Sequence, residues 1–66
     1  MISYEPLWRT LKKKKITQYQ LINLYGVSTG PLDALRKNKS VTLNTIQDLC
    51  GILQCPIQDI VEIISE

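Results

Sequence analysis

The sequence predicts a single all-α domain of five short helices. Apolar residues recur at intervals of three and four along most of the chain, which is the spacing of one face of an amphipathic helix. Residue types that favour helix ends, such as Thr, Ser, Gly and Asn, separate these stretches. With 66 residues, the chain has the length of one small domain, and we assign residues 1–66 to it.

The first helix is expected over residues 4–14. Ser3 is the candidate cap, and Pro6 falls in the first turn, where its missing N–H has no cost. The apolar face is formed by Tyr4, Leu7, Trp8 and Leu11. Residues 12–15 are lysines at the C-terminal end, where cations complement the helix dipole. Residues 1–4 either form a strand against a second copy or fray.

The second helix is expected to start at Thr17, because Thr17 and Gln20 have the spacing of a capping box. Gly26 is expected to end this helix in the left-handed conformation. The residues expected to face the core are Leu21, Leu24 and Tyr25.

A Gly-Pro pair in "VSTGPLDALRKN" normally marks a turn, yet here it begins a third helix. If Ser28 is the cap, Pro31 is the third helical residue. If Gly30 is the cap, Pro31 is the first. Both starts tolerate proline, because the N–H groups of the first turn have no acceptor within the helix. Asn38 is the expected left-handed terminator. The residues expected to be buried are Leu32 and Leu35.

Two further helices are expected in the C-terminal part of the chain. Thr42 caps the fourth helix and Pro56 begins the fifth. The expected buried stripe of the fourth helix is Leu43, Ile46, Leu49, Cys50 and Leu53. The expected apolar face of the fifth helix is Ile57, Ile60, Val61 and Ile64. Ile63 falls beside that face, which suggests a surface for self-association.

The composition argues against an enzyme and against a metal or cofactor site. The chain has no His, which is the commonest general base and metal ligand, and no recognisable set of nucleophile and base. Cys50 and Cys55 do not have the spacing of a zinc pair. A disulfide between them is possible, but two reduced, partly buried thiols are the preferred interpretation. A chain of this length has little room for a cofactor pocket.

The N-terminal stretch also lacks the pattern of a signal peptide, because its cations follow its few apolar residues. No run of about 18 apolar residues is present, so we expect no membrane span and a cytoplasmic protein.

Charge is distributed unevenly along the chain. Residues 1–40 contain all eight cations and two acids, a net charge of +6, whereas residues 41–66 contain four acids and no cation, a net charge of −4. This asymmetry indicates one surface suited to a polyanion and a separate acidic end.

Two short helices joined by a turn of about four residues that contains Gly26 form a helix-turn-helix pattern. The shared apolar positions are Leu21, Tyr25, Gly26, Val27, Leu32 and Leu35. The second helix then presents its polar face outward, and an α-helix fits the major groove of B-DNA, which is about 12 Å wide. That face holds Thr29, Gly30, Asp33, Ala34, Arg36 and Lys37.

The segments "TQYQLINLYGVSTGPLDALRKN" and "TLNTIQDLCGILQCPIQDIVEII" resemble the Cro/C1-type (XRE-like) helix-turn-helix family. The chain is similar to the small stand-alone regulators of low-GC Gram-positive bacteria and their mobile elements. The resemblance covers almost the whole chain. It implies a five-helix lambda-repressor-like fold that binds operator DNA as a homodimer, without a cofactor or small-molecule ligand.

The resemblance also implies roles for individual residues. Gln18 matches a glutamine that binds a backbone phosphate, and Ser28 matches the start of the recognition helix, about residues 29–37. The predicted base-contacting residues are Thr29, Gly30, Asp33 and Ala34. The predicted phosphate-contacting residues are Gln18, Ser28, Arg36, Lys37, Asn38, Lys39, Lys14 and Lys15. The chain departs from the family at Ile22, where a small residue is usual, and in its short base-reading side chains.

These features are consistent with two functions. The first is a sequence-specific DNA-binding transcriptional regulator, expected to be a repressor. The second is a protein-interaction module, of antirepressor or antitoxin type, that kept the fold without specific DNA readout. The short side chains at the base-reading positions and the acidic Asp33 motivate the second function.

Overall fold

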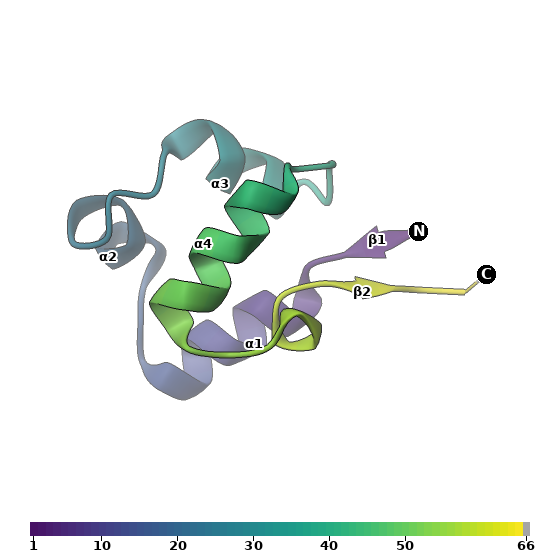
Figure 1. Cartoon of the computed structure of the whole chain (residues 1–66), viewed down its shortest axis with the longest axis horizontal. Coiled ribbons are helices and arrows are strands. Elements are labelled where there is room, and N and C mark those ends of the chain that lie inside the picture. The colour runs from purple at the N-terminus through teal and green to yellow at the C-terminus, as the bar shows by residue number, and fades with distance from the viewer. Residues whose placement is uncertain (66) are drawn as a thin grey trace.

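The computed structural model describes residues 1–65, which form four α-helices, one 3-10 turn and a two-stranded antiparallel sheet (Figure 1). The elements are β1 (Ile2–Ser3), α1 (Glu5–Lys14), α2 (Gln18–Asn23), α3 (Thr29–Arg36), α4 (Leu43–Leu53), the 3-10 turn η1 (Ile57–Asp59) and β2 (Glu62–Ile63). The fold is mostly helical, as predicted, with four α-helices where five were expected.

One cluster of buried side chains forms the core, and every α-helix contributes to it. Its members are Tyr4, Leu7, Leu11, Leu21, Leu32, Leu35, Ile46, Leu49, Leu53 and Ile60. All of these positions were predicted from the helical spacing to face the core. Because one cluster joins all the helices, the position of α3 depends on packing contributed by the whole chain.

The starts of α2 and α4 agree with the predicted caps Thr17 and Thr42, whereas the start of α1 differs from the predicted cap Ser3. In the capping box of α2, the Gln20 N–H donates to Thr17 Oγ1 over 3.1 Å and the Thr17 N–H donates to Gln20 Oε1 over 2.8 Å. The Thr45 N–H donates to Thr42 Oγ1 over 3.2 Å at the start of α4. Tyr4 takes the N-cap backbone position of α1, although the Ser3 hydroxyl still accepts a bond from the Glu5 N–H.

Three residues predicted to be buried in the second and fourth helices are exposed. Helix α2 ends at Asn23, so Leu24 and Tyr25 lie in the following turn, with 70% and 46% of their surface exposed. Leu43 is 79% exposed because it is the first residue of α4, one turn before the part of the helix that packs on the core.

The predicted fifth helix is wrong. After Pro56 the chain makes the single turn η1 and continues as the strand β2. Ile60 is buried and Val61 is half-buried, but Ile57 and Ile64 are exposed. β-branched residues fit an extended strand better than a helix when a partner strand is available.

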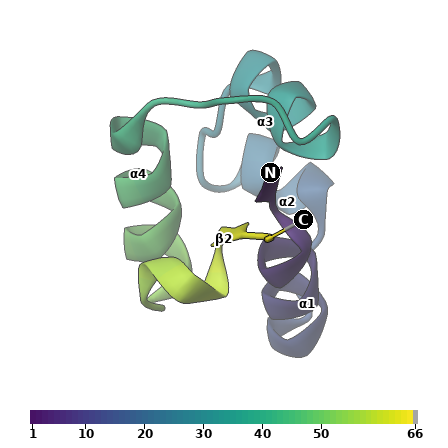
Figure 2. The same ribbon diagram turned by 90° about the vertical axis from the view of Figure 1, so that its right-hand side faces the viewer.

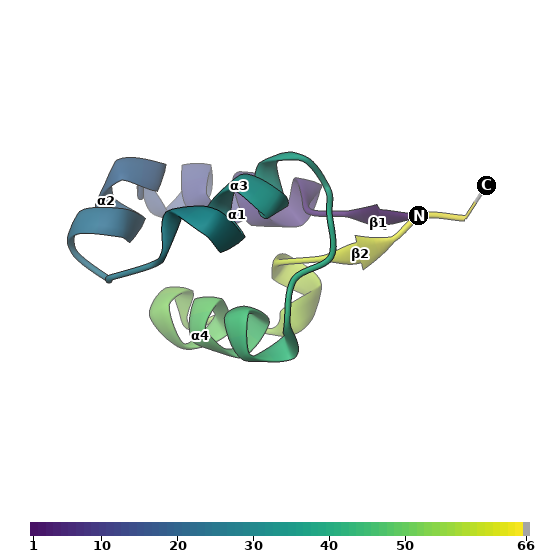
Figure 3. The same ribbon diagram turned by 90° about the horizontal axis from the view of Figure 1, so that it is seen from above.

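That partner is β1, so the N-terminal segment neither frays nor needs a second copy to pair. Ile2 lies opposite Ile63 and Ser3 opposite Glu62. The pairing of β1 with β2 continues one residue further, because the Ile64 N–H donates to the Met1 carbonyl over 2.8 Å. Both ends of the described chain therefore project from the same end of the molecule (Figure 3). No helix within residues 1–65 is long and apolar enough to cross a membrane.

Candidate nucleic-acid interface

Helices α2 and α3 are joined by a sharp turn whose geometry depends on Gly26. Gly26 has a φ of +72°, a conformation that glycine adopts without strain. The following Val27 N–H donates to the Leu21 carbonyl over 3.0 Å and closes the turn. Leu21 of α2 and Leu32 of α3 are both fully buried, so the two helices share one small core, as predicted.

The start of α3 follows the first of the two predicted arrangements. Ser28 is the N-cap residue, Thr29 and Gly30 are the first two helical residues, and Pro31 is the third. The Ser28 side chain makes no capping hydrogen bond, and the Ser28 carbonyl accepts from the Leu32 N–H over 3.4 Å. Proline costs this helix no internal hydrogen bond, since its position lies within the first turn.

The outward face of α3 is open to solvent. Thr29, Gly30 and Asp33 are exposed, and Ala34 is half-buried at the edge of the face. Figure 3 shows α3 on the near side of the molecule's upper layer, in front of α1. The described chain therefore leaves free the face that was predicted to contact bases.

Arg36 and Gln18 lie together across the helix-turn-helix. The Arg36 Nε–H donates to Gln18 Oε1 over 2.5 Å, which links the last residue of α3 to the first residue of α2. Both residues were predicted to contact phosphate, but their mutual contact was not predicted, because they are 18 positions apart.

Lys37 and Asp33 form an ion pair of 3.1 Å along the exposed side of α3. Both side chains are more than half exposed, so the pair adds little to stability. Its consequence is electrostatic, because Asp33 partly neutralises a cation that was predicted to contact phosphate.

The end of α3 is fixed by Asn38 and Tyr4. Asn38 has a φ of +54°, as predicted for the terminator, and its Oδ1 accepts from the Tyr4 N–H over 3.2 Å. The Tyr4 hydroxyl, which is almost fully buried, donates to the Lys39 carbonyl over 2.8 Å. These bonds use the Asn38 side-chain oxygen within the fold and leave its Nδ2 group as the donor available to a phosphate.

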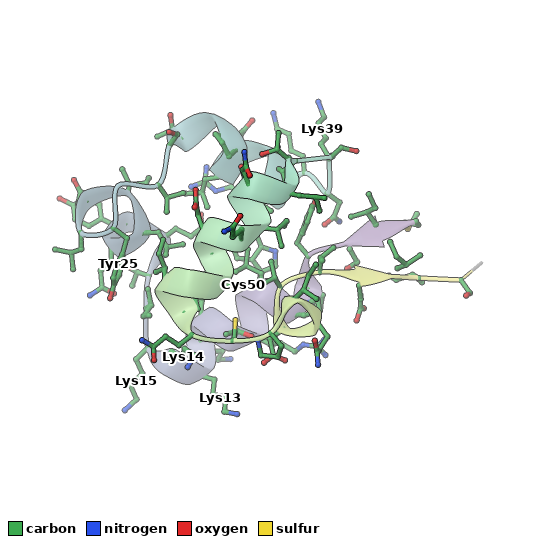
Figure 4. The ribbon with its side chains drawn as sticks, viewed as in Figure 1. Lys13, Lys14, Lys15, Tyr25, Lys39 and Cys50 are labelled. Atoms are coloured by element: carbon green, nitrogen blue, oxygen red, sulfur yellow. The ribbon has the colours of Figure 1, made fainter. Side chains whose placement is uncertain are left out.

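The lysines form two separate groups. Figure 4 shows Lys13, Lys14 and Lys15 at one end of the molecule and Lys39 at the opposite end. Figure 2 agrees, since the C-terminal end of α1 and helix α3 lie at opposite ends of that view as well. Lys14 and Lys15 therefore lie far from Lys39, another predicted phosphate contact.

Metal-binding groups and thiols were the other candidate sites within residues 1–65. No group of three or more His, Cys, Asp or Glu side chains in this range could hold a metal ion. Cys50 and Cys55 are free thiols, as preferred from the sequence. Burial raises the pKa of the Cys55 thiol, and the neighbouring Cys50 and Asp59 raise it further, while Lys14 opposes them.

Comparison with protein families identifies the fold. Residues 6–66 match the family model of the Cro/C1-type HTH DNA-binding domain. The chain belongs to the Cro/C1-type HTH family. A search of curated proteins found no match to this Cro/C1-type chain.

A solved structure supports the family assignment. The chain is similar to the transcriptional regulator VanUg, with a TM-score of 0.88 and 32% sequence identity over 98% of this chain and 87% of that one. Within this Cro/C1-type chain, Ile22 is half-buried and packs against the core.

Proposed function

We propose that this Cro/C1-type protein is a sequence-specific transcriptional regulator, acting as a repressor, that binds operator DNA as a homodimer. In this proposal α3 inserts into the major groove. The observation that carries the proposal is that the outward face of α3 is exposed to solvent. The Arg36–Gln18 hydrogen bond connects α3 to α2 and helps to hold it in this position. The likeness to VanUg, a transcriptional regulator, supports the same class of function.

Base contacts are assigned to the outward face of α3. Thr29 can make one hydrogen bond or touch a thymine methyl, and Ala34 offers only apolar contact. Gly30 has no side chain and open space in front of it, so it allows a close approach of the helix backbone to DNA. Asp33 can accept from cytosine N4. Direct readout is therefore sparse, and DNA shape and half-site spacing supply the remaining specificity.

Phosphate contacts are assigned to the rim of the same surface. The rim residues are Gln18, Ser28, Arg36, Lys37, Asn38 and Lys39. Lys14 and Lys15 lie at the opposite end of the molecule from Lys39, so their contact with phosphate is a separate prediction. The DNA affinity of a chain with both lysines replaced by glutamine tests it.

Titration of labelled DNA at several salt concentrations tests the proposal. If six phosphates are neutralised, the logarithm of the binding constant falls against the logarithm of salt with a slope of about −5. Selection of bound sequences from random DNA then gives the operator, and the spacing of the recovered half-sites reports the oligomer. Binding without salt dependence, or recovery of no preferred sequence, contradicts the proposal.

The alternative is a protein-interaction module that kept the fold and lost DNA readout. The Asp33–Lys37 pair favours it, since it places a neutralising carboxylate on the face meant for DNA. In that case Gln18→Ala and Lys37→Glu leave any DNA affinity unchanged, whereas the regulator loses affinity with both.

A further inference from the structure

Cys50 and Cys55 are held next to each other by the turn that ends α4. The Cys50 carbonyl accepts from the Gln54 N–H and also from the Cys55 N–H, the second over 3.2 Å. Gln54, the residue before Cys55, has a φ of +50°, the left-handed conformation. In a helix end of this type, the residue after the left-handed one commonly places its side chain against the residue five positions earlier. The turn therefore directs the Cys55 side chain toward Cys50.

The backbone separation of the two cysteines suits a disulfide. Because a single hydrogen bond joins their backbones, the two Cα atoms lie within about 7 Å of each other, the upper limit for bridging two cysteines. Burial raises the pKa of the Cys55 thiol, and Cys50 raises it further, which agrees with two neighbouring sulfur atoms. The sequence contains no third cysteine, so no other thiol of the chain competes for either one.

We propose that Cys50 and Cys55 form a reversible disulfide when the chain meets an oxidant of the hydroperoxide class. Both thiols are half-buried, so a small oxidant can reach them from solvent. Disulfides that form in a compartment that keeps thiols reduced are usually transient and respond to the redox state. The pair is therefore a site of oxidative modification that acts apart from the DNA-binding surface.

The oxidation takes place in two steps. The Cys50 sulfur attacks one oxygen of the hydroperoxide, the O–O bond breaks, and the products are a Cys50 sulfenic acid and an alcohol, or water if the oxidant is hydrogen peroxide. The Cys55 sulfur then attacks the Cys50 sulfur, the S–O bond breaks, and the hydroxyl leaves as water with the Cys55 proton. The two thiols together lose two electrons and two protons, which the peroxide gains. Cys50 is assigned the first attack, because the raised pKa of Cys55 leaves less of that thiol as thiolate.

The disulfide closes a short loop around Gln54. The left-handed conformation is unfavourable for a residue with a side chain, so the reduced turn is a weak point between α4 and η1. A cross-link around this residue restricts the unfolded chain and so stabilises the turn. Figures 1 and 2 both show the C-terminal end of α4 away from α3. Oxidation is therefore expected to raise stability and to leave the face of α3 unaltered.

Equilibration with glutathione redox buffers tests the pairing. After acid quenching, mass spectrometry separates reduced chains from chains lighter by two hydrogen atoms, and their ratio gives the effective concentration of the two thiols. This concentration is expected to be about ten-fold or more higher in the folded chain than in urea, because the folded turn holds the thiols together. An equal or lower value in the folded chain, or disulfides that form only between chains, overturns the proposal.

Treatment with equimolar hydrogen peroxide tests the chemistry and its consequence. The folded chain is expected to lose both free thiols and to unfold at a higher urea concentration, and dithiothreitol is expected to reverse both changes. Cys50→Ser and Cys55→Ser are the matched controls, since each keeps one thiol and cannot close the loop, and peroxide should not stabilise either. Oxidation to sulfinic acid without a disulfide, or a disulfide that leaves the urea midpoint unchanged, contradicts the proposed switch. These measurements use no DNA, so their outcome is independent of the proposed function.

Discussion

Arg36 and Gln18 connect the two helices of the helix-turn-helix through a hydrogen bond from Arg36 Nε to Gln18 Oε1. Both side chains are thus oriented before any DNA is bound. A guanidinium that is already held in place loses less conformational freedom on contacting a phosphate than a free one does.

Gln18→Ala and Arg36→Ala are therefore each expected to lower DNA affinity by about ten-fold, the size of one charge-assisted hydrogen bond. The double variant should lose less than the sum of the two, with a coupling of about 0.5 kcal/mol or more, because each single change also releases the other side chain. A double-mutant cycle measured by DNA titration checks this. Gln58→Ala, an exposed glutamine of η1, is the control and should bind normally. Strict additivity would show that the bond plays no part in binding.

Substitutions at the cap residues of α2, α3 and α4 distinguish effects on stability from effects on DNA affinity. Thr17 and Thr42 accept capping hydrogen bonds, whereas Ser28 makes none. Thr17→Ala and Thr42→Ala should each lower the free energy of unfolding by about 1 kcal/mol. Ser28→Ala should leave stability within about 0.5 kcal/mol and lower only DNA affinity. Urea denaturation of the three variants measures this, and equal losses of stability would contradict the assignment.

The Tyr4 hydroxyl supports the loop that follows α3, because it donates to the Lys39 carbonyl. Tyr4→Phe removes this bond from a nearly buried site and should lower the free energy of unfolding by about 1 kcal/mol. It should also weaken DNA binding, since the backbone that positions Lys39 is less restrained. Tyr19→Phe, at a tyrosine that is 73% exposed, is the control for both measurements. A Tyr4 variant that is as stable as this control would contradict the proposed support.

Local chemistry explains which parts of the fold could be predicted. The capping box at Thr17, the left-handed Gly26 and Asn38, and the helix start around Pro31 all follow from preferences of single residues or of close pairs. Lys15 and Gln54 also end helices with φ of +59° and +50°. Neither residue type signals that conformation, so the left-handed backbone at these two positions could not be predicted.

Contacts between distant residues explain the failures. The β-branched residues from Ile60 to Ile64, which flank Glu62, fit a helix or a strand, and the choice depends on β1, which lies at the other end of the sequence. By contrast, the exposure of the outward residues of α3 could be predicted, because it follows from the helical register of α3 alone. The Arg36–Gln18 bond could not be predicted, because it depends on how α2 and α3 pack.

The Cys55 thiol provides a pH-dependent test. Burial raises its pKa in the folded chain, so the unfolded thiol ionises at lower pH than the folded one. Stability should therefore fall as the pH rises through the alkaline range where only the unfolded thiol is ionised. In a Cys50→Ser chain, iodoacetamide should modify Cys55 more slowly in the folded state than in urea at the same pH. Equal rates would contradict the raised pKa.

Asp33 gives the sharpest test of the DNA-facing surface. Asp33→Asn removes a carboxylate that repels phosphate and also frees Lys37 from its ion pair. Affinity for DNA of any sequence should rise, and the slope against salt should become steeper by about 1, as one more cation reaches a phosphate. Lys37→Gln should change both quantities in the opposite direction.

The matched control is Asp48→Asn, which changes the net charge equally but lies on α4, so it should alter affinity much less. Equal gains from Asp33→Asn and Asp48→Asn would mean that only net charge matters and that α3 does not face the DNA. If Asp33→Asn instead weakens binding only to sites with cytosine at one position, Asp33 reads that base, because the loss is then confined to the sequences that offer its N4 amino group.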